Sequence, residues 1–196
     1  MQVSVIHNLN KVIENMPLSA VLEQIQDGTH SVMIEKLRNI IKDGNIEHYK
    51  QFKKSLPAFT PSGTFNSIRK AENLSSYNSC IILDIDNIEQ SLLQSVFNAI
   101  IECPFTFACF RSPSNHGIKI IVVTDGTLHF HSHNFSQVKK LFENLLGLPI
   151  DASGSDVARM CFFSWDNNLF INNNYQIFKT EKTMIINEMN MLVDII

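Results

Sequence analysis

The chain has 196 residues, of which 44% are hydrophobic and 18% charged, a balance that excludes wholesale disorder. Its net charge of −3 argues against a uniformly basic nucleic-acid-binding protein. The sequence shows neither a signal-peptide pattern nor an apolar run long enough to cross a bilayer, so we expect a cytoplasmic protein. The four cysteines stand far apart without a CxxC pair, and we expect reduced, buried thiols.

The first third of the sequence predicts mainly helices. A short strand is expected at 3–6, and a helix with apolar residues on one face runs from Leu18 to Gly28. Two further helices are expected, at 34–41 and, short and basic, at 46–54. The segment 56–65 contains two prolines and a glycine, which break the helical pattern and indicate an ordered loop.

From Tyr77 onward the pattern changes to strands that alternate with helices. Strands are expected at 80–85, 105–110, 118–123, 159–164 and 169–171, and helices at 91–101 and 135–146. A strand, a helix, a strand and then a hairpin-like strand are typical of a ferredoxin-like or RRM-type sheet with flanking helices. We therefore predict an α+β fold, with a helical basic segment at 1–76, an α+β core at 77–180 and a tail at 181–196.

Basic residues gather between Lys36 and Lys70, where eight of them stand against two acidic residues. A basic segment beside an acidic remainder suits a protein that binds phosphates and also presents carboxylates. A solvated helix surface explains the same charge run. The candidate nucleic-acid-binding residues in this segment are Lys50, Lys53, Lys54, Arg69 and Lys70.

The apolar strand that ends in Asp84 and Asp86 carries the strongest chemical signal. Strand alternation puts both carboxylates on one face, where they repel each other by about 1–4 kcal/mol at near-surface dielectric. A divalent cation relieves that repulsion, and hard oxygen ligands favour Mg²⁺ or Mn²⁺. The alternative is that Asp86 caps the next helix while Asp84 pairs with a lysine.

Two later segments carry further polar candidates. The turn at 112–117 offers Ser112, Ser114 and His116 and leads to Lys119, a set suited to phosphate, although a plain hairpin loop explains it as well. The segment 151–159 contains two aspartates, either of which can complete a metal site, and an arginine that can bind a triphosphate. Turn-forming aspartates with an ion pair are the alternative.

The order of these three motifs resembles that of the archaeo-eukaryotic primase superfamily. More closely, the chain resembles the VirE N-terminal domain family of Bacteroidetes mobile elements, a branch of that superfamily. The segments that carry the resemblance are LPAFTPSGTF (56–65), LDID (83–86), SPSNHGIKI (112–120) and the run D…SD..R.CF.S.D (151–166).

The resemblance implies a primase-polymerase that adds nucleotides to a primer during replication of a mobile element. Asp84 and Asp86 would hold two divalent metal ions with a third carboxylate, for which Asp151 is preferred over Asp156. Lys119 and Arg159, with Ser112 and Ser114, would bind the nucleoside triphosphate. Lys119 stands where classical primases have a histidine, which leaves equivalent catalysis open. The basic segment would follow a DNA template, and a helicase encoded separately or on a longer chain would be a partner.

Two other functions compete with this interpretation. His129 and His131 form a His-hydrophobic-His pair, as in HUH-type replication or mobilisation nucleases, but the only late tyrosine, Tyr175, lies in an asparagine-rich turn. The other alternative is a degenerate primase-like module that binds nucleic acid without catalysis.

Overall fold

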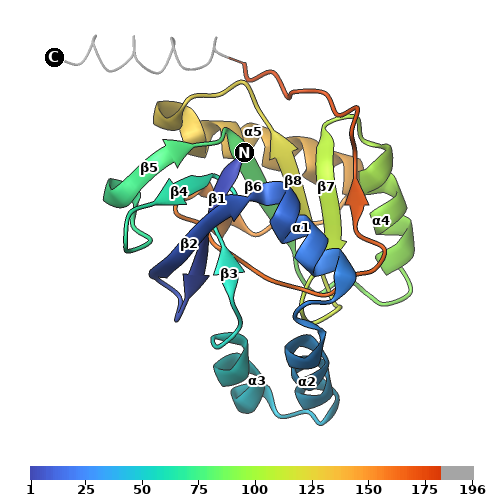
Figure 1. The fold of residues 1–196 in the computed structure, drawn as a ribbon. Coiled ribbons are helices and arrows are strands. Elements are labelled where there is room, and N and C mark those ends of the chain that lie inside the picture. Colours follow the sequence, from blue (N-terminus) through green and yellow to red (C-terminus); the bar gives the residue numbers. More distant parts are fainter. Residues whose placement is uncertain (182–196) are drawn as a thin grey trace, which may run out of the picture.

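The computed structural model describes residues 1–181, so the predicted tail at 181–196 lies, except for its first residue, outside the described residues. The fold is α+β, as predicted, with five α-helices and antiparallel sheets in this part of the chain (Figure 1). Among the described residues, no helix has both the length and the apolar character that a membrane span requires.

The central sheet has the strand order β10-β7-β8-β6, and each pair of neighbours is antiparallel. Its strands are β6 (Cys80–Ile85), β7 (Thr106–Arg111), β8 (Ile118–Val123) and β10 (Phe170–Ile171). Since β6 and β7 both run antiparallel to β8, they are parallel to each other, and α4 (Leu93–Glu102) connects them. The predicted succession of strand, helix, strand and strand is confirmed.

Both faces of this sheet are buried, which explains why its strands are almost continuously apolar. On one face, Ile81, Leu83 and Ile85 pack with α4 and α5 (His131–Leu146). On the other, Cys80 and Ile82 pack with α1 (Leu18–Asp27) and a second sheet. Asp84 follows the alternation of this second face, so its carboxylate lies on the side opposite α4 and α5.

The second sheet has the order β2-β1-β3-β9, and it corrects the prediction of a helical first third. Its strands are β1 (Gln2–His7), β2 (Lys11–Pro17), β3 (Ala58–Phe59) and β9 (Cys161–Phe162). The opening strand was expected, but β2 was not, because most of its residues are exposed and its apolar pattern is weak. Asn8 and Leu9 both have positive φ in the turn that reverses the chain.

Strand β3 joins distant parts of the chain, because it pairs with β1 on one edge and β9 on the other. This sheet therefore crosses the predicted boundary near residue 76. The expected loop at 56–65 contains β3 and β4 (Gly63–Phe65), and β4 pairs with an unexpected strand, β5 (Leu74–Tyr77). The strand expected at 159–164 is only two residues long.

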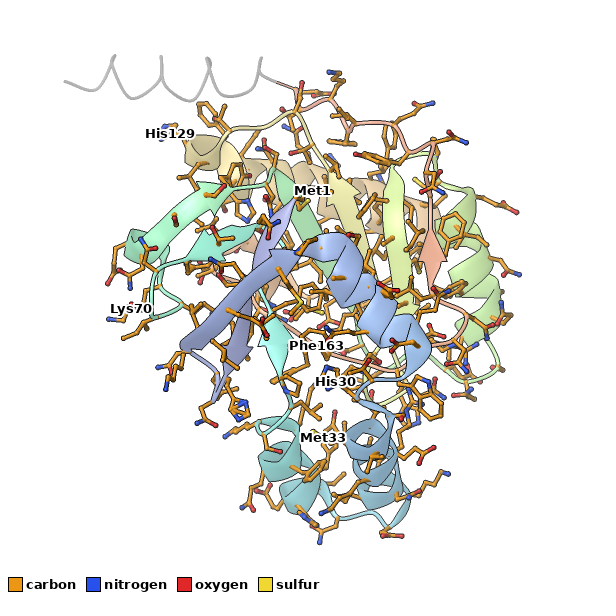
Figure 2. The ribbon with its side chains drawn as sticks, viewed as in Figure 1. Met1, His30, Met33, Lys70, His129 and Phe163 are labelled. Atoms are coloured by element: carbon orange, nitrogen blue, oxygen red, sulfur yellow. The ribbon has the colours of Figure 1, made fainter. Side chains whose placement is uncertain are left out.

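Helices α2 (Ser31–Lys42) and α3 (Ile46–Lys53) form a hairpin that projects from the two sheets (Figure 1). A small core of Ile34, Leu37 and Leu56 holds it together. At its junction with the body, His30 packs edge-on against Phe163, with ring centroids 4.6 Å apart (Figure 2). The hairpin thus stands beside β9, at the end of the central sheet that carries Asp84.

A buried histidine ties β5 to the start of α5. His131 is 4% exposed, and its Nδ1 lies 2.9 Å from the Tyr77 hydroxyl oxygen. Burial lowers the pKa of His131 to about 4, although the nearby Asp156 partly opposes this effect. Between pH 6.5 and about 4, the folded protein therefore holds a neutral imidazole, whereas His131 in the unfolded chain would bind a proton.

This histidine makes stability depend on pH. Between pH 6.5 and about 4 the unfolded chain binds a proton that the folded chain does not, so stability falls as the pH falls through this window. Urea unfolding at pH 7 and pH 4 should show wild type losing about 3 kcal/mol more than His131→Gln, which keeps a partner for Tyr77. Equal losses in the two proteins would contradict the neutral, buried state of His131.

Candidate metal and nucleotide site

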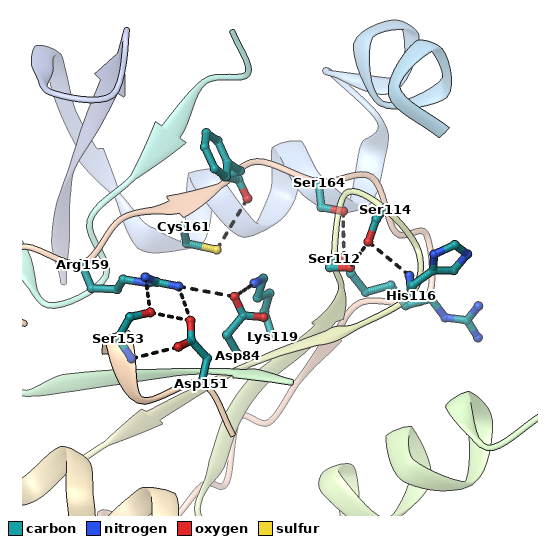
Figure 3. A network of polar contacts seen from close by, with 12 residues as sticks. Asp84, Ser112, Ser114, His116, Lys119, Asp151, Ser153, Arg159, Cys161 and Ser164 are labelled. Carbon is teal, nitrogen blue, oxygen red and sulfur yellow. Dashed lines mark hydrogen bonds and ion pairs between the residues drawn. The ribbon is translucent and has the colours of Figure 1, made fainter. Parts of the chain in front are cut away.

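The site is built around an ion pair between neighbouring strands. Asp84 near the end of β6 lies directly opposite Lys119 of β8 in the sheet register. The ammonium of Lys119 contacts Asp84 Oδ2, and both side chains are largely buried (Figure 3). Burial alone would lower the pKa of Lys119, but the attraction of Asp84 outweighs it and the pKa is raised. Lys119 is therefore a fixed positive charge at neutral pH.

Arg159 links Asp84 to the segment that follows α5. Its Nη2 lies 3.0 Å from Asp151 Oδ2 and 3.5 Å from Asp84 Oδ2, and its Nη1 contacts the Ser153 hydroxyl (Figure 3). The main chain is also joined here, because the amide of Asp151 donates to the carbonyl oxygen of Asp84 at 3.0 Å. The segment around Asp151 thus lies along the edge of β6 that is not paired with β8.

Three carboxylates meet at this edge. One oxygen each from Asp84, Asp86 and Asp151 lies within 4.8 Å of the other two, and this is the only such group of potential metal-binding side chains among residues 1–181. Partial desolvation and the negative charge of Asp84 raise the pKa of Asp86. Desolvation acts in the same direction on Asp151, but hydrogen bonds from Ser153 and the charge of Arg159 lower its pKa overall.

The donor set fits a hard divalent cation. All three groups are carboxylates, which Mg²⁺ and Mn²⁺ prefer over softer ligands. Asp84 Oδ1 is buried, yet it has no hydrogen-bond partner among residues 1–181. A buried charged oxygen without a partner is costly, and a cation next to it removes that cost. The structure therefore contains a group that could hold a metal ion, and it identifies no particular ion.

A pocket of about 120 Å³ opens beside Asp84. Its lining includes the three cationic side chains of Lys53, Lys119 and Arg159, together with Cys161 and Phe162 of β9. Lys53 comes from the last turn of α3, so the helical hairpin closes one side of the pocket. Cations that converge beside carboxylates offer a binding place for an anion such as a phosphate group.

The predicted phosphate-binding turn lies at the same end of the sheet. Ser112 and Ser114 share a hydrogen bond of 3.0 Å between their hydroxyls, and the amide of His116 is 3.4 Å from Ser114 Oγ (Figure 3). A Cβ atom on Gly117 would lie 2.4 Å from the carbonyl oxygen of Ile85, so only glycine permits this close approach. Ser114 and His116 line a second pocket of about 300 Å³ with Asp86 and Lys53.

Asp156 lies outside the carboxylate group. Its Oδ1 accepts a hydrogen bond of 2.9 Å from the amide of Ala158, and its carbonyl oxygen accepts one from the amide of Arg159. These contacts are those of a turn-forming aspartate. Of the two candidates for a third carboxylate, the structure brings Asp151 to Asp84 and Asp86.

The predicted nucleic-acid-binding residues do not form one surface. Lys50, Lys53 and Lys54 lie on or next to α3, but Lys50 pairs with the exposed Glu47. Arg69 donates to the main-chain carbonyls of Leu9 and Ala158, which is a structural contact. Lys70 pairs with Glu72 and lies away from the hairpin (Figure 2). Among these five residues, Lys53 alone lines the pocket beside Asp84.

The histidines of the nuclease alternative belong to no three-residue ligand group among the described residues. His129 lies in the short 3₁₀ helix Leu128–Phe130, on the side of the molecule away from the hairpin (Figure 2). His131 is buried against Tyr77, and Tyr175 packs against Phe107 with ring centroids 5.0 Å apart. The arrangement therefore lends no support to a nuclease site.

Three residues of the site, Ser153, Cys161 and Phe162, were given no role from the sequence. Ser153 donates from its amide to Asp151 Oδ1 at 3.0 Å and so orients that carboxylate. Its position two residues after an aspartate is the pattern of an Asx turn, and this signal was available. The wall formed by Phe162 and Cys161 depends on pairing with β3, about a hundred residues earlier, which no local pattern indicates.

Comparison with known proteins adds one match. A family model described as BT4734-like, N-terminal domain, matches residues 51–170, more than half of the chain. The chain belongs to this family. The matched region of the BT4734-like domain contains the three carboxylates, Lys53, Lys119 and Arg159. No curated protein and no solved structure gives a significant match.

Arg159 is expected to compete with a metal ion for the carboxylates. Removing its charge in Arg159→Gln should tighten Mn²⁺ binding about tenfold, because one of the two cations beside Asp84 Oδ2 is lost. Isothermal titration with MnCl₂ measures this change. Arg111→Gln makes the same charge change away from the carboxylates and should leave the affinity unaltered. Weaker Mn²⁺ binding by Arg159→Gln would show that Arg159 mainly orients Asp151.

Proposed function

We propose that this BT4734-like domain is a nucleotidyltransferase of the primase-polymerase type. It would hold Mg²⁺ or Mn²⁺ with Asp84, Asp86 and Asp151 and add nucleotides to a primer on a DNA template. The observation that carries the proposal is the meeting of these three carboxylates beside a buried Asp84 oxygen that has no partner among residues 1–181. The motif order in the sequence, which resembles VirE N-terminal domains, gives the proposal its specific form.

Charge balance supports a site for both metal and triphosphate. Three carboxylates stand near three cations, Lys53, Lys119 and Arg159, so the protein groups alone are close to neutral. Two divalent ions would add positive charge, and a triphosphate would add negative charge of similar size. The site would therefore stay close to neutral when both are bound. When bound, the metal ions would activate the attacking 3′-hydroxyl and stabilise the leaving pyrophosphate.

The chain's own residues would bind and orient the nucleotide. Lys119 would fix Asp84 and present its positive charge to the pocket, where Arg159 and Lys53 also point. Such preformed cations stabilise the charge that develops on a transferred phosphoryl group. Ser112, Ser114 and His116 would contact the nucleotide from the turn between β7 and β8, since that turn lies against the main chain at Ile85.

The order of the central elements agrees with this class of enzyme. Strand β6, helix α4, strands β7 and β8 and helix α5, with β8 between β6 and β7, follow the first five elements of a ferredoxin-like or RRM-type fold. The next segment departs from that plan, because Asp151 begins a 3₁₀ turn beside β6 where a fourth strand would add. We further propose a cytoplasmic role in replicating a mobile element, with a helicase as partner.

A non-catalytic nucleic-acid-binding module is the second candidate. It is favoured by the fact that Lys119 and Arg159 already neutralise Asp84, so the network can be stable as an ion-pair cluster. In that case the carboxylates would serve the fold alone, and nucleic-acid binding would not respond to divalent cations.

Template-directed extension of a labelled primer tests the proposal. With Mg²⁺ or Mn²⁺, wild type should extend the primer, and Asp84→Asn should lose activity at least about a hundredfold, because it removes a metal ligand but keeps the shape of the side chain. Asp43→Asn, an exposed aspartate at the end of α2, is the matched control and should extend normally. A folded wild-type protein that adds no nucleotide would refute the proposal.

A further inference from the structure

Four neighbouring pockets lie in succession along the helical hairpin, because each shares lining residues with the next. The pocket beside Asp84 shares Lys53 with the pocket of about 300 Å³. That pocket shares Ile41, Ser114 and His116 with one of about 480 Å³. The pocket of about 480 Å³ in turn shares Arg38 and Asn115 with a fourth pocket, of about 260 Å³. We call this path the hairpin groove; it runs between the α2–α3 hairpin and the β7–β8 turn and ends at residues 165–168.

Positive charge extends along the whole hairpin groove. Lys53, Lys42, Arg38 and Arg111 follow one another in the successive pockets, and His116 lies between them. Asp86 and Asp166 are the acidic residues of the last three pockets. Asp166 is buried and accepts hydrogen bonds from the amides of Arg111, at 2.7 Å, and Asn168, at 3.1 Å, so the protein itself uses this carboxylate.

Aromatic and amide side chains lie between these charged residues. Tyr49 lines the pocket next to Asp86, and Trp165 lines the pocket at the far end. Aromatic rings of this kind stack with unpaired bases, while asparagines offer both donors and acceptors to base edges. The asparagines of the hairpin groove are Asn87, Asn115, Asn167 and Asn168.

Arg38 holds together the end of the hairpin groove that lies near Trp165. From α2, its Nε donates to the carbonyl of Pro113 at 3.1 Å and its Nη2 to that of Trp165 at 2.9 Å. Its guanidinium also lies over the Trp165 ring, 5.8 Å from the centroid. One side chain therefore joins the hairpin, the β7–β8 turn and the loop after β9, so this end is formed before a ligand binds.

We propose that the hairpin groove binds a single strand of nucleic acid that passes from Trp165 toward the carboxylates. Charges repeated along a path match a phosphodiester backbone better than the single anchoring site that a phosphopeptide needs. The aromatic rings suit separated bases, which a duplex keeps stacked on one another. The inference extends the proposed function by giving the path of one strand, and it uses residues other than Lys50, Lys54, Arg69 and Lys70.

Trp165 provides the test, because it is the only tryptophan in the sequence. Full-length protein is titrated with single-stranded oligothymidylate in EDTA and low salt, and Trp165 fluorescence is recorded. Stacking of a base should quench it, and the affinity should fall with salt with a logarithmic slope of about −3 for four phosphate contacts. Because EDTA removes divalent cations, this binding is measured independently of catalysis.

A double variant, Lys42→Gln/Arg111→Gln, tests the path. It should weaken binding about tenfold to a hundredfold at about 50 mM salt and make the slope shallower by about 1.4, since two phosphate contacts are lost. Lys42 is exposed at the end of α2, and the Arg111 guanidinium donates a hydrogen bond only to Gln94 among the described residues, so the fold should persist. Lys11→Gln/Lys140→Gln removes the same charge elsewhere and should bind like wild type.

The outcomes separate this inference from the proposed function. Equal binding by the groove variant and wild type, absence of quenching at Trp165, or stronger binding of duplex DNA or a phosphopeptide would each overturn the inference. Loss of binding in the groove variant with Mn²⁺ binding unchanged would support it. Specific strand binding without primer extension would instead refute the proposed function and leave the hairpin groove as the strand-binding surface.

Discussion

The ion pair between Asp84 and Lys119 is the interaction on which the site depends. An isolated carboxylate is costly on a strand that is otherwise apolar and covered on both faces. Lys119 supplies the opposite charge from the neighbouring strand, at the directly facing position. A slip of one residue between β6 and β8 would turn one of the two side chains to the other face, so the pair also specifies the register.

The remaining residues gather around this pair from separate parts of the fold. Arg159 and Asp151 come from the segment along the free edge of β6, and Lys53 comes from α3. Each charged group is stabilised by the others, because burying a carboxylate next to a cation costs less free energy than burying either group alone. The arrangement is complete as an ion-pair cluster, and under the proposed function the buried Asp84 oxygen, which has no partner among the described residues, would contact the metal ion.

How far the sequence predicts the structure depends on how local each signal is. Strand alternation predicted that the side chain of Asp84 lies on one face of a buried strand, and the structure puts it on the face opposite Ile85. Helix α1 ends next to Gly28, as expected. Strands β3 and β9 have two residues each, so their pairing arises from tertiary contacts and leaves no periodic pattern. The family resemblance preferred Asp151 over Asp156, and the contact that brings Asp151 to Asp84, the hydrogen bond from the Asp151 amide to the Asp84 carbonyl, is likewise a long-range one.

Strand β3 determines what a minimal version of this domain must contain. The family match begins at residue 51, but β3 depends on β1 for one edge, and α1 covers the inner core of the central sheet. A fragment that started at the match would leave β3 and β9 as an open two-residue ladder and expose apolar surface, a template for aggregation. The unit that we expect to fold is therefore longer than the matched region, because the first fifty residues contribute β1 and α1 to the scaffold that positions Cys161 and Phe162 beside the carboxylates.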